Sequence, residues 1–471
     1  MSIDLGTTRL KVAAFAPDGA LLELRARRHR DHGEGGSRWQ NPDEWWQDTA
    51  ALVSEVRAAV QARLGSCRVL GLSLSGRGGA AIFADAQGDV LLPPWQDDRH
   101  GPQRMALRTA FPELAPYTSA LLAKCLWLRD EAPTLFARAR YALYAKDFLL
   151  LRLTGAHLTD WSSGPDGPAW PAAALAELQL PATLLPRPAL PWQLAGGLTP
   201  AAARLLQLPA ETPVAVGAHD GICANVGAGA CRPGDYVITL GTNAVVRAVT
   251  QRPSEDAYRF YCLPEDRQVV GGNAWLGGRA ADWLLDLLGA DRDHRDEAFA
   301  SLEAAAAGVP VGASGVRFLP YLGGQVAPER HPEARGVLAG LRVDHGSAAT
   351  YRAVLEGVTF AVAEVFDQVH GWAGEPRMIR LTGGGARSAL WTSMLAAVLG
   401  RPLELTDGAA ESRGAAVFLA QALGLHDSYD AAADAMVAVS DQVVVDAGQS
   451  AAYVDVQADW TRLRNLLRAY S

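Results

Sequence analysis

Short runs of alternating or continuous apolar residues recur along the chain, and several of them end at glycine. Residues 3–15 have the pattern of a strand, a tight Gly-Thr turn and a second strand. Residues 236–240 (Tyr-Val-Ile-Thr-Leu) form another β-rich run, which ends at a Gly-Thr-Asn loop. Two further runs, 69–75 and 379–382, have the pattern of buried strands followed by glycines. This pattern predicts sheets whose strand ends are marked by glycine turns.

Helical periodicity lies between these strands. Residues 42–64 predict an amphipathic helix, with Asn41 as its cap and Pro42 in its first turn. Residues 348–370 predict the clearest long helix, with apolar side chains of valine and alanine on one face. Alternation of strands and helices predicts an α/β protein. A chain of 471 residues is too long for one ordinary core, so we expect two large domains.

One short motif occurs twice. When Ile3 is aligned with Ile238, the Leu-Gly-Thr of residues 5–7 falls on the Leu-Gly-Thr of residues 240–242. The alternative interpretation is that the two Gly-Thr turns are unrelated. We predict two copies of one β-hairpin unit, each opening a domain, and we place the domains at residues 1–230 and 231–471.

The residues around these turns suggest phosphate chemistry. A strand that runs into a Gly-Thr loop presents backbone N–H groups, which suit a phosphate. Asp220 lies a short way before the second loop, and Asp4 in the first copy is replaced by Thr239 in the second. We interpret Asp220 as the acceptor of a proton from a hydroxyl group, while the loops hold a phosphoryl donor. One carboxylate, Asp4, is enough to bind the divalent cation that accompanies ATP.

A third glycine turn, residues 383–388, follows the predicted strand 379–382 and precedes a predicted helix from about residue 389. Glycine permits close approach of a nucleotide to the backbone, so this turn is a candidate nucleotide-binding corner. It matches neither the dinucleotide fingerprint nor the Walker motif. A small-residue helix that opens at Glu411 is expected to pack against this corner.

Composition narrows the class of protein. The net charge of −8, without a dense Lys/Arg stripe, argues against a nucleic-acid partner. No apolar run approaches the roughly 18 residues of a membrane span. The five cysteines have no C-x-x-C spacing and resemble reduced cytosolic thiols, and Met1 leads directly into a strand, which leaves no room for a signal peptide. We therefore expect a cytoplasmic protein.

The loop around Trp95 is a second candidate site. Trp95 stands near Asp97 and Arg99, and an exposed indole beside polar groups suits the stacking of a sugar. The alternative is a solvated loop with one anchoring tryptophan. The run 71–75 (Gly-Leu-Ser-Leu-Ser) lacks the second glycine of a hydrolase nucleophile elbow, so a serine nucleophile is not expected there.

Taken together and in this order, the motifs resemble those of the FGGY carbohydrate kinases, which have the actin-like ATPase fold, and of the xylulokinases among them in particular. The resemblance covers nearly the whole chain. Its carriers are Asp4-Leu5-Gly6-Thr7-Thr8, Trp95-Gln96-Asp97-Asp98-Arg99, Lys146-Asp147-Phe148, Asp220-Gly221, Gly241-Thr242-Asn243-Ala244, Phe318-Leu319-Pro320-Tyr321-Leu322, Arg335-Gly336-Val337, Leu355-Glu356-Gly357-Val358 and Gly383-Gly384-Gly385-Ala386-Arg387-Ser388.

The resemblance implies an α/β fold of two ribonuclease H-like (actin/hexokinase-type ATPase) domains with a central nucleotide cleft. It implies ATP and Mg²⁺ as cofactors, Asp220 as catalytic base and Asp4 as the carboxylate near the metal. The residues that it implies for ATP binding are Gly6, Thr7, Thr8, Gly241, Thr242, Asn243, Gly278, Gly384, Gly385, Ala386 and Ser388. Substrate contacts are expected at Gly76, Arg77, Trp95, Asp97, Asp220 and Gly221.

Departures from the xylulokinase pattern bear on the substrate. Xylulokinases typically show Gln-Met-His-Gly where this chain has Ser-Gly-Arg-Gly at residues 75–78, and the pair Asp220-Gly221 looks more like gluconokinases. Arg77 would bind a carboxylate through its guanidinium fork, or alternatively pair within the protein with an acid such as Asp97.

We expect a small sugar or sugar-acid substrate: xylulose first, gluconate second and a polyol such as glycerol or erythritol third. An actin-like ATPase that binds proteins is the rival from a different class. The family also suggests a homodimer.

Overall fold

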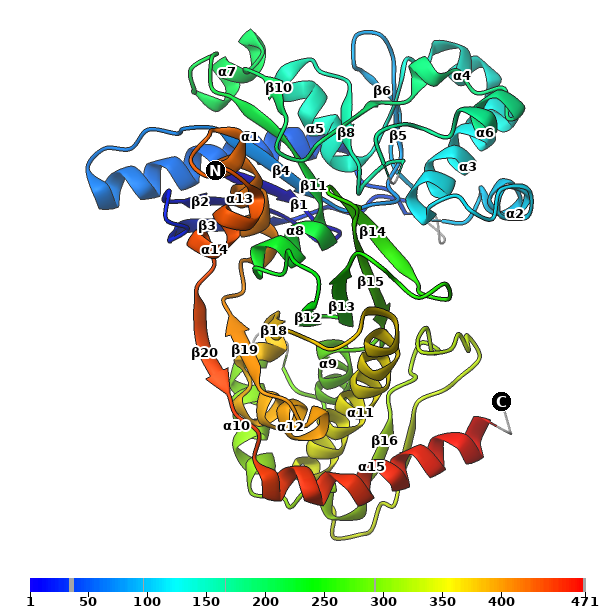
Figure 1. The fold of residues 1–471 in the computed structure, drawn as a ribbon, viewed down its shortest axis with the longest axis vertical. Helices are drawn as coiled ribbons and strands as arrows, with labels where there is room; N and C mark the ends of the chain where they lie inside the picture. The colour runs from blue at the N-terminus through cyan, green and yellow to red at the C-terminus, as the bar shows by residue number, and fades with distance from the viewer. Residues whose placement is uncertain (34–37, 96, 166, 292–293, 469–471) are drawn as a thin grey trace. The chain divides into compact units, whose positions relative to one another are not determined.

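The computed structural model describes residues 1–33, 38–95, 97–165, 167–291 and 294–468 (Figure 1). The chain divides into two compact units. Unit 1 comprises Met1–Cys231, Tyr261–Asp266 and Ala409–Val437, and unit 2 comprises Arg232–Phe260, Arg267–Gly408 and Ala438–Ser471. Two segments of unit 1 therefore come from the sequence range that we assigned to the second domain.

The main sheet of unit 1 has six strands in the order β10-β11-β4-β1-β2-β3. Strands β1, β2 and β3 form an antiparallel meander, whereas β4 is parallel to both β1 and β11. The strands are β1 (Ser2–Leu5), β2 (Arg9–Phe15), β3 (Leu21–Arg28), β4 (Leu72–Gly76), β10 (Leu194–Gly196) and β11 (Val214–His219).

The other elements of unit 1 are mostly helical. Small sheets are formed by β5 (Ile82–Ala84) with β6 (Val90–Leu92) and β7 (Tyr141–Leu143), and by β8 (Leu158–Asp160) with β9 (Arg187–Ala189). The helices are α1 (Pro42–Leu64), α2 (Gly101–Ala110), α3 (Pro116–Glu131), α4 (Pro133–Arg138), α5 (Ala145–Thr154), α6 (Ala172–Glu177), α7 (Pro200–Leu206), α8 (Asp220–Gly227), α13 (Ala410–Ala422) and α14 (Tyr429–Met436). The predicted helix over residues 42–64 is confirmed, and the Asn41 side chain caps it by accepting from the Asp43 N–H.

The two faces of the unit 1 sheet differ because successive side chains on a strand point to opposite sides. On one face, Ile3 and Leu5 of β1 join the apolar residues of β4 and of α1 in one buried cluster. On the other face lie the buried polar residues Asp4 of β1 and Ser75 of β4. This polar face is the one that Glu411 of α13 reaches, through an ion pair with Lys11 of β2.

Helices α8 and α13 pack closely through glycine. A Cβ atom added to Gly414 of α13 would lie 1.9 Å from the carbonyl oxygen of Cys223, and one added to Gly227 of α8 would lie 1.8 Å from that of Ala410. Only glycine fits at such a contact between backbones. The helix from Glu411, which we expected to pack on the corner at residues 383–388, has α8 as its partner within unit 1.

Unit 2 repeats the hairpin of unit 1. Strands β12 (Asp235–Leu240) and β13 (Ala244–Thr250) are antiparallel, and β12 is parallel to β18 (Met378–Thr382), as β1 is to β4. This confirms the predicted duplication of one hairpin unit. The sheet order is β14-β15-β13-β12-β18-β19-β20, in which the remaining strands are β14 (Arg259–Leu263), β15 (Arg267–Asn273), β19 (Leu403–Thr406) and β20 (Val439–Val443).

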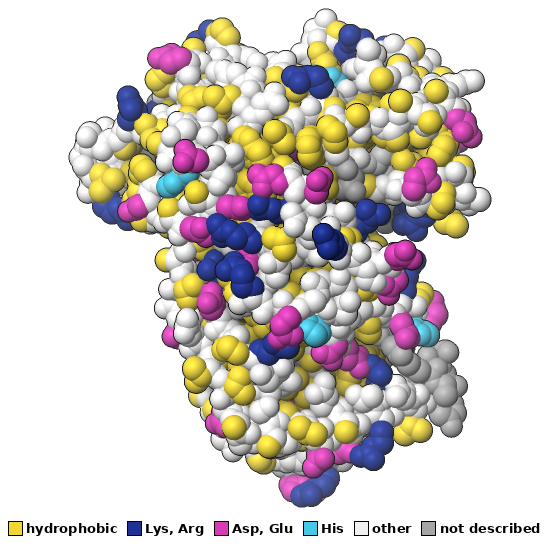
Figure 2. Space-filling model, viewed as in Figure 1, with side chains coloured by type: hydrophobic (Ala, Val, Ile, Leu, Met, Phe, Trp, Pro, Cys, Tyr) yellow, Lys and Arg dark blue, Asp and Glu magenta, His cyan; other side chains and the backbone are white. Residues whose placement is uncertain are grey.

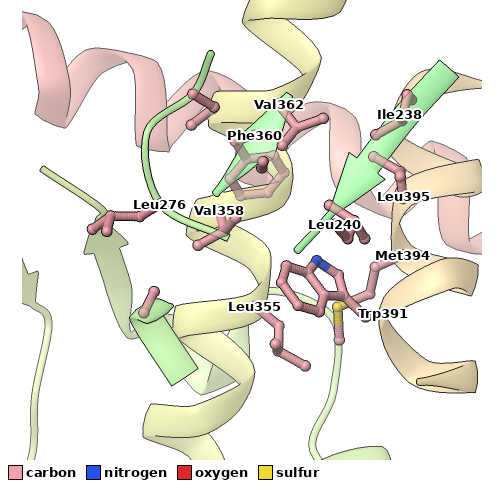
Figure 3. Packing of buried hydrophobic residues seen from close by; sticks show 14 of the residues in the cluster. Ile238, Leu240, Leu276, Leu355, Val358, Phe360, Val362, Trp391, Met394 and Leu395 are labelled. Atoms are coloured by element: carbon pink, nitrogen blue, oxygen red, sulfur yellow. The ribbon is translucent and has the colours of Figure 1, made fainter. Parts of the chain in front are cut away.

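The core of unit 2 lies between this sheet and two long helices. The predicted long helix is α11 (Ser347–Ala373), and α12 (Ala389–Leu399) follows the third glycine turn as expected. Figure 3 shows Trp391 of α12 beside Leu240 of β12 and Leu355 of α11, all nearly inaccessible to solvent. Unit 2 also contains α9 (Gly278–Leu287), α10 (Arg295–Ala307), α15 (Ala447–Arg468) and the hairpin β16 (Arg317–Leu319) with β17 (Val337–Ala339).

Figure 2 shows that Lys and Arg side chains lie beside Asp and Glu side chains on the face drawn. None of the helices in the described part of the chain combines the length and apolar character needed to cross a membrane.

Candidate active site

Asp220 stands where a strand of the unit 1 sheet meets a helix. Strand β11 ends at His219, and Asp220 is the first residue of α8. The carboxyl ends of the parallel strands β1, β4 and β11 meet at the same edge of the sheet, so the loops after Leu5 and Gly76 lie at this edge too. The positive end of the α8 dipole favours the ionised carboxylate. The Asp220 side chain is 31% exposed, so a ligand can reach it.

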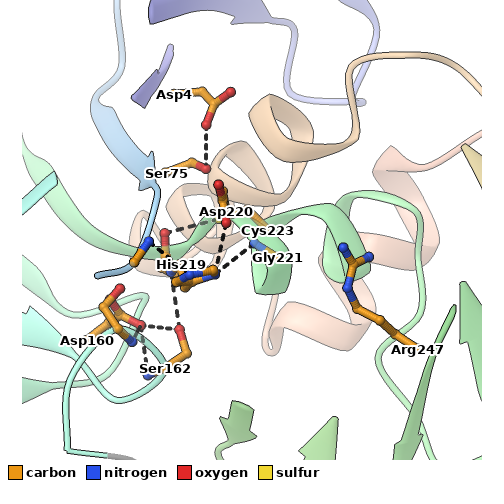
Figure 4. Close-up of polar contacts among 12 residues, drawn as sticks. Asp4, Ser75, Asp160, Ser162, His219, Asp220, Gly221, Cys223 and Arg247 are labelled. Atoms are coloured by element: carbon orange, nitrogen blue, oxygen red, sulfur yellow. Dashed lines mark hydrogen bonds and ion pairs between the residues drawn. The ribbon is translucent and has the colours of Figure 1, made fainter. Parts of the chain in front are cut away.

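The imidazole of His219 contacts the Asp220 carboxylate (Figure 4). Its Nδ1 lies 3.0 Å from Asp220 Oδ1 and 2.9 Å from the Gly221 nitrogen, and its Nε2 lies 3.0 Å from the Gly78 nitrogen. The two contacts at Nδ1 require opposite protonation, because Nδ1–H donates to a carboxylate whereas bare Nδ1 accepts from an N–H. The Nδ1–H tautomer satisfies two of the three contacts, since Nε2 then accepts from Gly78. His219 thereby orients the Asp220 carboxylate.

A buried ionic network supports His219. The His219 N–H donates to the Ser162 hydroxyl, which in turn hydrogen-bonds to Asp160. Lys146 Nζ lies 2.8 Å from Asp160 and 2.7 Å from Asp147, and all three side chains are inaccessible to solvent. Burial by itself raises the pKa of Asp160, but Lys146 and Ser162 outweigh burial and lower this pKa below its usual value. The network fixes the backbone immediately before Asp220.

Two tyrosines form an aromatic wall beside this site. The ring centroids of Tyr117 and Tyr261 each lie 4.6 Å from that of His219. A Cβ atom on Gly221 would lie 2.3 Å from the Tyr261 hydroxyl, and one on Gly78 would lie 2.3 Å from Tyr117. The predicted site residue Gly221 is therefore small because Tyr261 lies against it.

Asp4, the predicted metal carboxylate, is buried on the polar face of the sheet. Its Oδ1 accepts from the Ser75 hydroxyl at 2.8 Å, and its Oδ2 lies 3.2 Å from Lys11, which also pairs with Glu411. Burial raises the pKa of Asp4 to about 6, against the opposing charge of Lys11, while Glu411 and Asp220 raise it further.

These surroundings bear on the fit of Mg²⁺. Within the described residues, no group of three or more His, Cys, Asp or Glu side chains is arranged to hold a metal ion. Mg²⁺ in phosphoryl-transfer enzymes is held by one or two carboxylates together with the phosphates. Asp4 fits that mode of binding, because two other carboxylates, Glu411 and Asp220, act on it and a cation would offset their negative charge. The residues present fit the ion.

The predicted phosphate loop at Gly6, Thr7 and Thr8 has its carbonyl oxygens bound by the protein. Gly6 O contacts His29 Nε2, Thr7 O accepts from Arg77 and Gln40, and Thr8 O accepts from the His29 N–H. The two threonines are exposed. The Gly6 N–H is engaged as well, since it donates to Arg9 O at 3.1 Å.

Arg77 and Asp97 do not pair with each other. Arg77 donates to Thr7 O at 3.1 Å and to Gln40 Oε1 at 2.9 Å, and its guanidinium lies over the Trp45 ring. Asp97 instead binds Arg99, with Arg99 Nε 2.7 Å from Asp97 Oδ1. Neighbouring Gln96 lies outside the described residues. The predicted site residue Gly76 ends β4 against Lys146, which a Cβ atom would approach to 2.8 Å.

Trp95 is not an exposed platform. The expectation of an exposed indole is wrong, because only 4% of Trp95 is accessible and its ring packs 5.2 Å from that of Trp127 and 6.3 Å from that of Phe83. An indole has a large apolar surface, and burying it against other rings is more favourable than leaving it in water. Lys124 and Arg99 cover its faces, with Lys124 Nζ 4.9 Å from the ring centroid.

In unit 2, the carbonyl oxygens of the predicted loop of Gly241, Thr242 and Asn243 are bound by the protein, as in its counterpart in unit 1. Gly241 O accepts from Gly278 N at 2.7 Å, Thr242 O from Gly277 N at 3.1 Å, and Asn243 O from Gly241 N at 3.0 Å. All three carbonyl groups are therefore engaged within unit 2. The structure also brings Gly278, the first residue of α9, directly against this loop.

The third glycine turn lies against the same loop. A Cβ atom on Gly383 would lie 2.6 Å from Leu240 O, and one on Gly385 would lie 2.8 Å from the Leu240 side chain. Gly384 and Ala386 form a short 3-10 turn, and Ser388 caps α12 while donating to Glu303 at 2.7 Å. A cavity of about 580 Å³ adjoins this cap, lined by Ala300, Glu303, Ala304, Ala307, Ala389, Leu390 and Ser393.

Comparison with known proteins decides what these two units are. The model of the N-terminal domain of the FGGY family of carbohydrate kinases matches residues 1–227, and that of the C-terminal domain matches residues 236–423. The chain belongs to the FGGY family of carbohydrate kinases. It is therefore a phosphotransferase that acts on a carbohydrate, as the resemblance of its motifs implied.

Individual FGGY kinases extend this result. Xylulose kinase of Escherichia coli (strain K12) is 31% identical over 433 residues, which cover 87% of this chain and 86% of that protein. Gluconokinase of Bacillus subtilis (strain 168) is 25% identical over 465 residues, covering 92% and 89%. The solved structure of xylulose kinase from Rhodospirillum rubrum has a TM-score of 0.85 and 26% identity, and covers 99% of this chain and 98% of that one. The predicted fold class, an α/β actin/hexokinase-type ATPase of two domains, is confirmed.

Several residues that surround the candidate site of this FGGY kinase were not predicted from the sequence. Lys11 had a usable signal, because the predicted hairpin places it opposite Asp4. His219 carried a weaker one, as the neighbour of Asp220. Tyr117, Tyr261 and Glu411 gave none, since their places depend on packing between segments far apart in the chain.

Proposed function

We propose that this protein transfers the γ-phosphoryl group of ATP to a hydroxyl group of a small sugar, with Asp220 as general base. The observation that carries the proposal is the setting of Asp220: a partly exposed carboxylate at a helix N-terminus, contacted by His219 and beside two tyrosine rings. Family membership supplies the reaction class. A base that takes the hydroxyl proton during attack on the γ-phosphorus contributes about 10²- to 10⁴-fold in rate.

The rest of the chemistry is positioning and charge neutralisation, because phosphoryl transfer needs little covalent participation by the protein. We assign the β- and γ-phosphates to the loops at residues 6–8 and 241–243. Gly6 N–H and Gly241 N–H already donate within these loops, to Arg9 O and Asn243 O, so the proposed phosphate donors are the N–H groups and hydroxyl groups of the residues that follow the two glycines. Asp4 is the proposed ligand of Mg²⁺, which supplies neutralisation of charge on the phosphate oxygens when bound. Ser75 and Lys11 orient Asp4 for this role.

The adenosine is assigned to unit 2, at Gly278 and at residues 384–388. The cavity beside Ser388 is lined largely by alanine, and its apolar lining suits the adenine ring. Glu303 lies in this lining and already accepts from Ser388, so it is fixed in place as a polar contact.

D-Xylulose is the first candidate acceptor, because two of the relatives above are xylulose kinases. Gluconate is the second, favoured by Arg77 and by the pair Asp220-Gly221, and a polyol is the third. The proposed acceptor contacts in unit 1 are Arg77, Asp220 and Gly221. Gly76, Asp97 and the buried Trp95 are kept as further proposed residues of the acceptor site.

The test is a coupled assay of ADP release with Mg²⁺ and ATP over D-xylulose, D-gluconate and glycerol. We expect ADP release to depend on an added acceptor and to match, mole for mole, a phosphorylated product. ATP hydrolysis that no acceptor stimulates would instead favour the rival hypothesis, an actin-like ATPase with a protein-binding role.

Three further expectations complete the proposal. A cytoplasmic location suits an enzyme that consumes ATP, and none of the five cysteines, all of which the structure describes, forms a disulfide. The domain boundary between residues 230 and 231 and the homodimer remain predictions. Size-exclusion chromatography with light scattering measures the oligomeric state.

A further inference from the structure

An arginine on the sheet of unit 2 is buried without an opposite charge. Arg247 lies on β13, shortly after the loop of residues 241–243, and only 8% of it is exposed. Its Nη1 donates to the Thr239 hydroxyl at 3.1 Å. Its cross-strand neighbours are Val237 on β12 and Gly271 on β15, and neither can balance a charge. Among the residues that the structure describes, no carboxylate is within ion-pair distance of Arg247.

The other arginine that is buried in the described part of unit 2 is fully paired. Arg352 of α11 lies 3.0 Å from Glu356 and also donates to the Tyr453 hydroxyl at 3.1 Å. Burying a charge is costly unless an opposite charge and hydrogen bonds compensate it. Arg352 meets this condition within the protein. The charge of Arg247 is left for another group to balance.

The hydrogen bond to Thr239 places the Arg247 guanidinium beside the phosphate loop that we assign to unit 2. Thr239 is the next-to-last residue of β12 and stands two positions before Gly241. A Cβ atom on Gly241 would lie 3.8 Å from the methyl carbon of Thr239. The loop therefore begins within van der Waals contact of the side chain that Arg247 binds.

The same face of the sheet carries the proposed metal carboxylate in unit 1. The equivalence follows from the register, because Asp4 pairs with Ser75 as Thr239 pairs with Thr382. In unit 1 the lysine on this face is balanced by Asp4. In unit 2 the position of that carboxylate is taken by Thr239, and the charge of Arg247 is retained. The first copy of the hairpin thus offers a carboxylate to a cation, and the second offers a cation that suits an anion.

Most of the hydrogen-bonding capacity of Arg247 is unused. A guanidinium has five N–H donors, of which Thr239 takes one. Nε and Nη2 have no partner within the described residues, and neither atom is fully enclosed by protein, so solvent or a ligand reaches them. Figure 4 shows the guanidinium at the end of an extended side chain. A phosphate group accepts two parallel N–H bonds from such a fork, and its negative charge compensates the buried cation.

We propose that Arg247 binds the β- and γ-phosphates of ATP at the loop of residues 241–243 and stabilises the charge that develops on them during transfer. In that step the acceptor oxygen bonds to the γ-phosphorus and the hydroxyl proton passes to Asp220. The bond from the γ-phosphorus to the β–γ bridging oxygen breaks, and ADP leaves with its electron pair. Arg247 donates to phosphate oxygens that gain negative charge, as preorganised donors do in other enzymes. This inference rests on the proposed function, because it takes the loop as a phosphate site.

The first test measures nucleotide binding without an acceptor. The wild type and Arg247→Met are titrated with MgATP, MgADP and AMP in a calorimeter. We expect the Kd values of MgATP and MgADP to rise by about 10- to 100-fold in the variant, as for the loss of charge-assisted hydrogen bonds, and that of AMP to stay within about twofold. Arg247→Lys, which keeps the charge but loses the fork, should recover part of the loss. An equal loss for all three nucleotides, or no loss, would overturn the proposal.

The second test distinguishes phosphate binding from a structural role. Replacing a buried charge that lacks a counter-ion by an apolar side chain of similar size is neutral or stabilising. The Tm of ligand-free Arg247→Met should therefore equal or exceed that of the wild type. Added MgATP should then raise the Tm of the variant by less than that of the wild type. A lower ligand-free Tm together with an unchanged Kd for MgATP would make Arg247 a structural residue and contradict the proposal.

Turnover gives the third readout, in the coupled ADP assay with whichever of D-xylulose, D-gluconate and glycerol the wild type phosphorylates fastest. In Arg247→Met, kcat should fall by about 100-fold, while the KM for the acceptor should stay within about twofold. The matched control is Arg380→Gln on β18, because Val237 of β12 pairs with Arg380 on one side and with Arg247 on the other. Arg380 already lies 3.0 Å from Glu404, so this variant should keep the wild-type kcat and Kd for MgATP.

The outcomes separate the two proposals. If the wild type phosphorylates an acceptor and Arg247→Met retains its kcat and its Kd for MgATP, the kinase function stands and the role of Arg247 is wrong. If the wild type phosphorylates no acceptor, the proposed function itself fails. The titrations with MgATP, MgADP and AMP still decide in that case whether Arg247 contacts phosphate, since they need no acceptor.

Discussion

Replacement of Asp220 by asparagine tests the centre of the proposed mechanism. The change preserves size and shape but removes the group that accepts the hydroxyl proton. General-base catalysis accounts for about 10²- to 10⁴-fold in rate, so we expect kcat to fall by about 1000-fold, or roughly 4 kcal/mol in the barrier. The KM for ATP should change little, because the phosphate loops do not include Asp220.

Folding should survive the substitution. Asp220 is 31% exposed, and its main structural contributions are the contact with His219 and the charge at the start of α8. A charge at a helix N-terminus is worth about 0.3–1 kcal/mol, which corresponds to at most a few degrees in Tm. Turnover is measured by the coupled ADP assay and Tm by calorimetry, with Asp98→Asn as the control, since Asp98 is a more exposed acid that pairs with Arg104. A kcat within tenfold of the wild type would refute the assignment of Asp220 as base.

Three other substitutions test its surroundings. His219→Phe should keep the ring packing but lower kcat by about 10- to 100-fold with a smaller effect on KM, because it releases the Asp220 carboxylate; an unchanged kcat would remove the orienting role. Lys146→Met leaves two carboxylates buried without a cation and should cost about 3–5 kcal/mol in urea unfolding, and adding Asp160→Asn should recover part of this. His157 is held neutral, its pKa lowered to about 4 by burial and by Arg140. Between pH 7 and pH 4 the unfolded chain therefore binds more protons than the folded one, so the free energy of unfolding should fall by at most about 3 kcal/mol over this range. The fall should be smaller in His157→Phe, and an equal fall in the variant and the wild type would contradict this.

The framework of the site could be predicted from the sequence because its signals are local. The hairpin that opens each unit is fixed by alternating apolar residues and a Gly-Thr turn, and the structure confirms both copies. The cap of α1 and the strand, turn and helix at residues 378–399 follow from equally local rules. The polar face of the unit 1 sheet was also within reach, since the register that pairs Ile3 with Val12 pairs Asp4 with Lys11.

Contacts between residues far apart in the chain were the part of the structure that the sequence did not predict. Helix α13 belongs to unit 1 although it follows most of unit 2 in the chain, and its partner α8 is recognisable only once Gly414 and Gly227 are seen in contact with the opposite backbone. The burial of Trp95 has the same origin. Its acidic and basic neighbours in sequence suggested exposure, but Phe83 and Trp127, from other elements, cover the indole.

The charge balance around Arg77 shows why such errors matter for function. From sequence, the acid nearest in type and place was Asp97, and an internal pair would have made Arg77 a structural residue. The structure gives Asp97 to Arg99 and gives Arg77 a second buried cation, Lys124, as neighbour. Because Asp97 is engaged by Arg99, Arg77 keeps its place as a proposed contact of the acceptor.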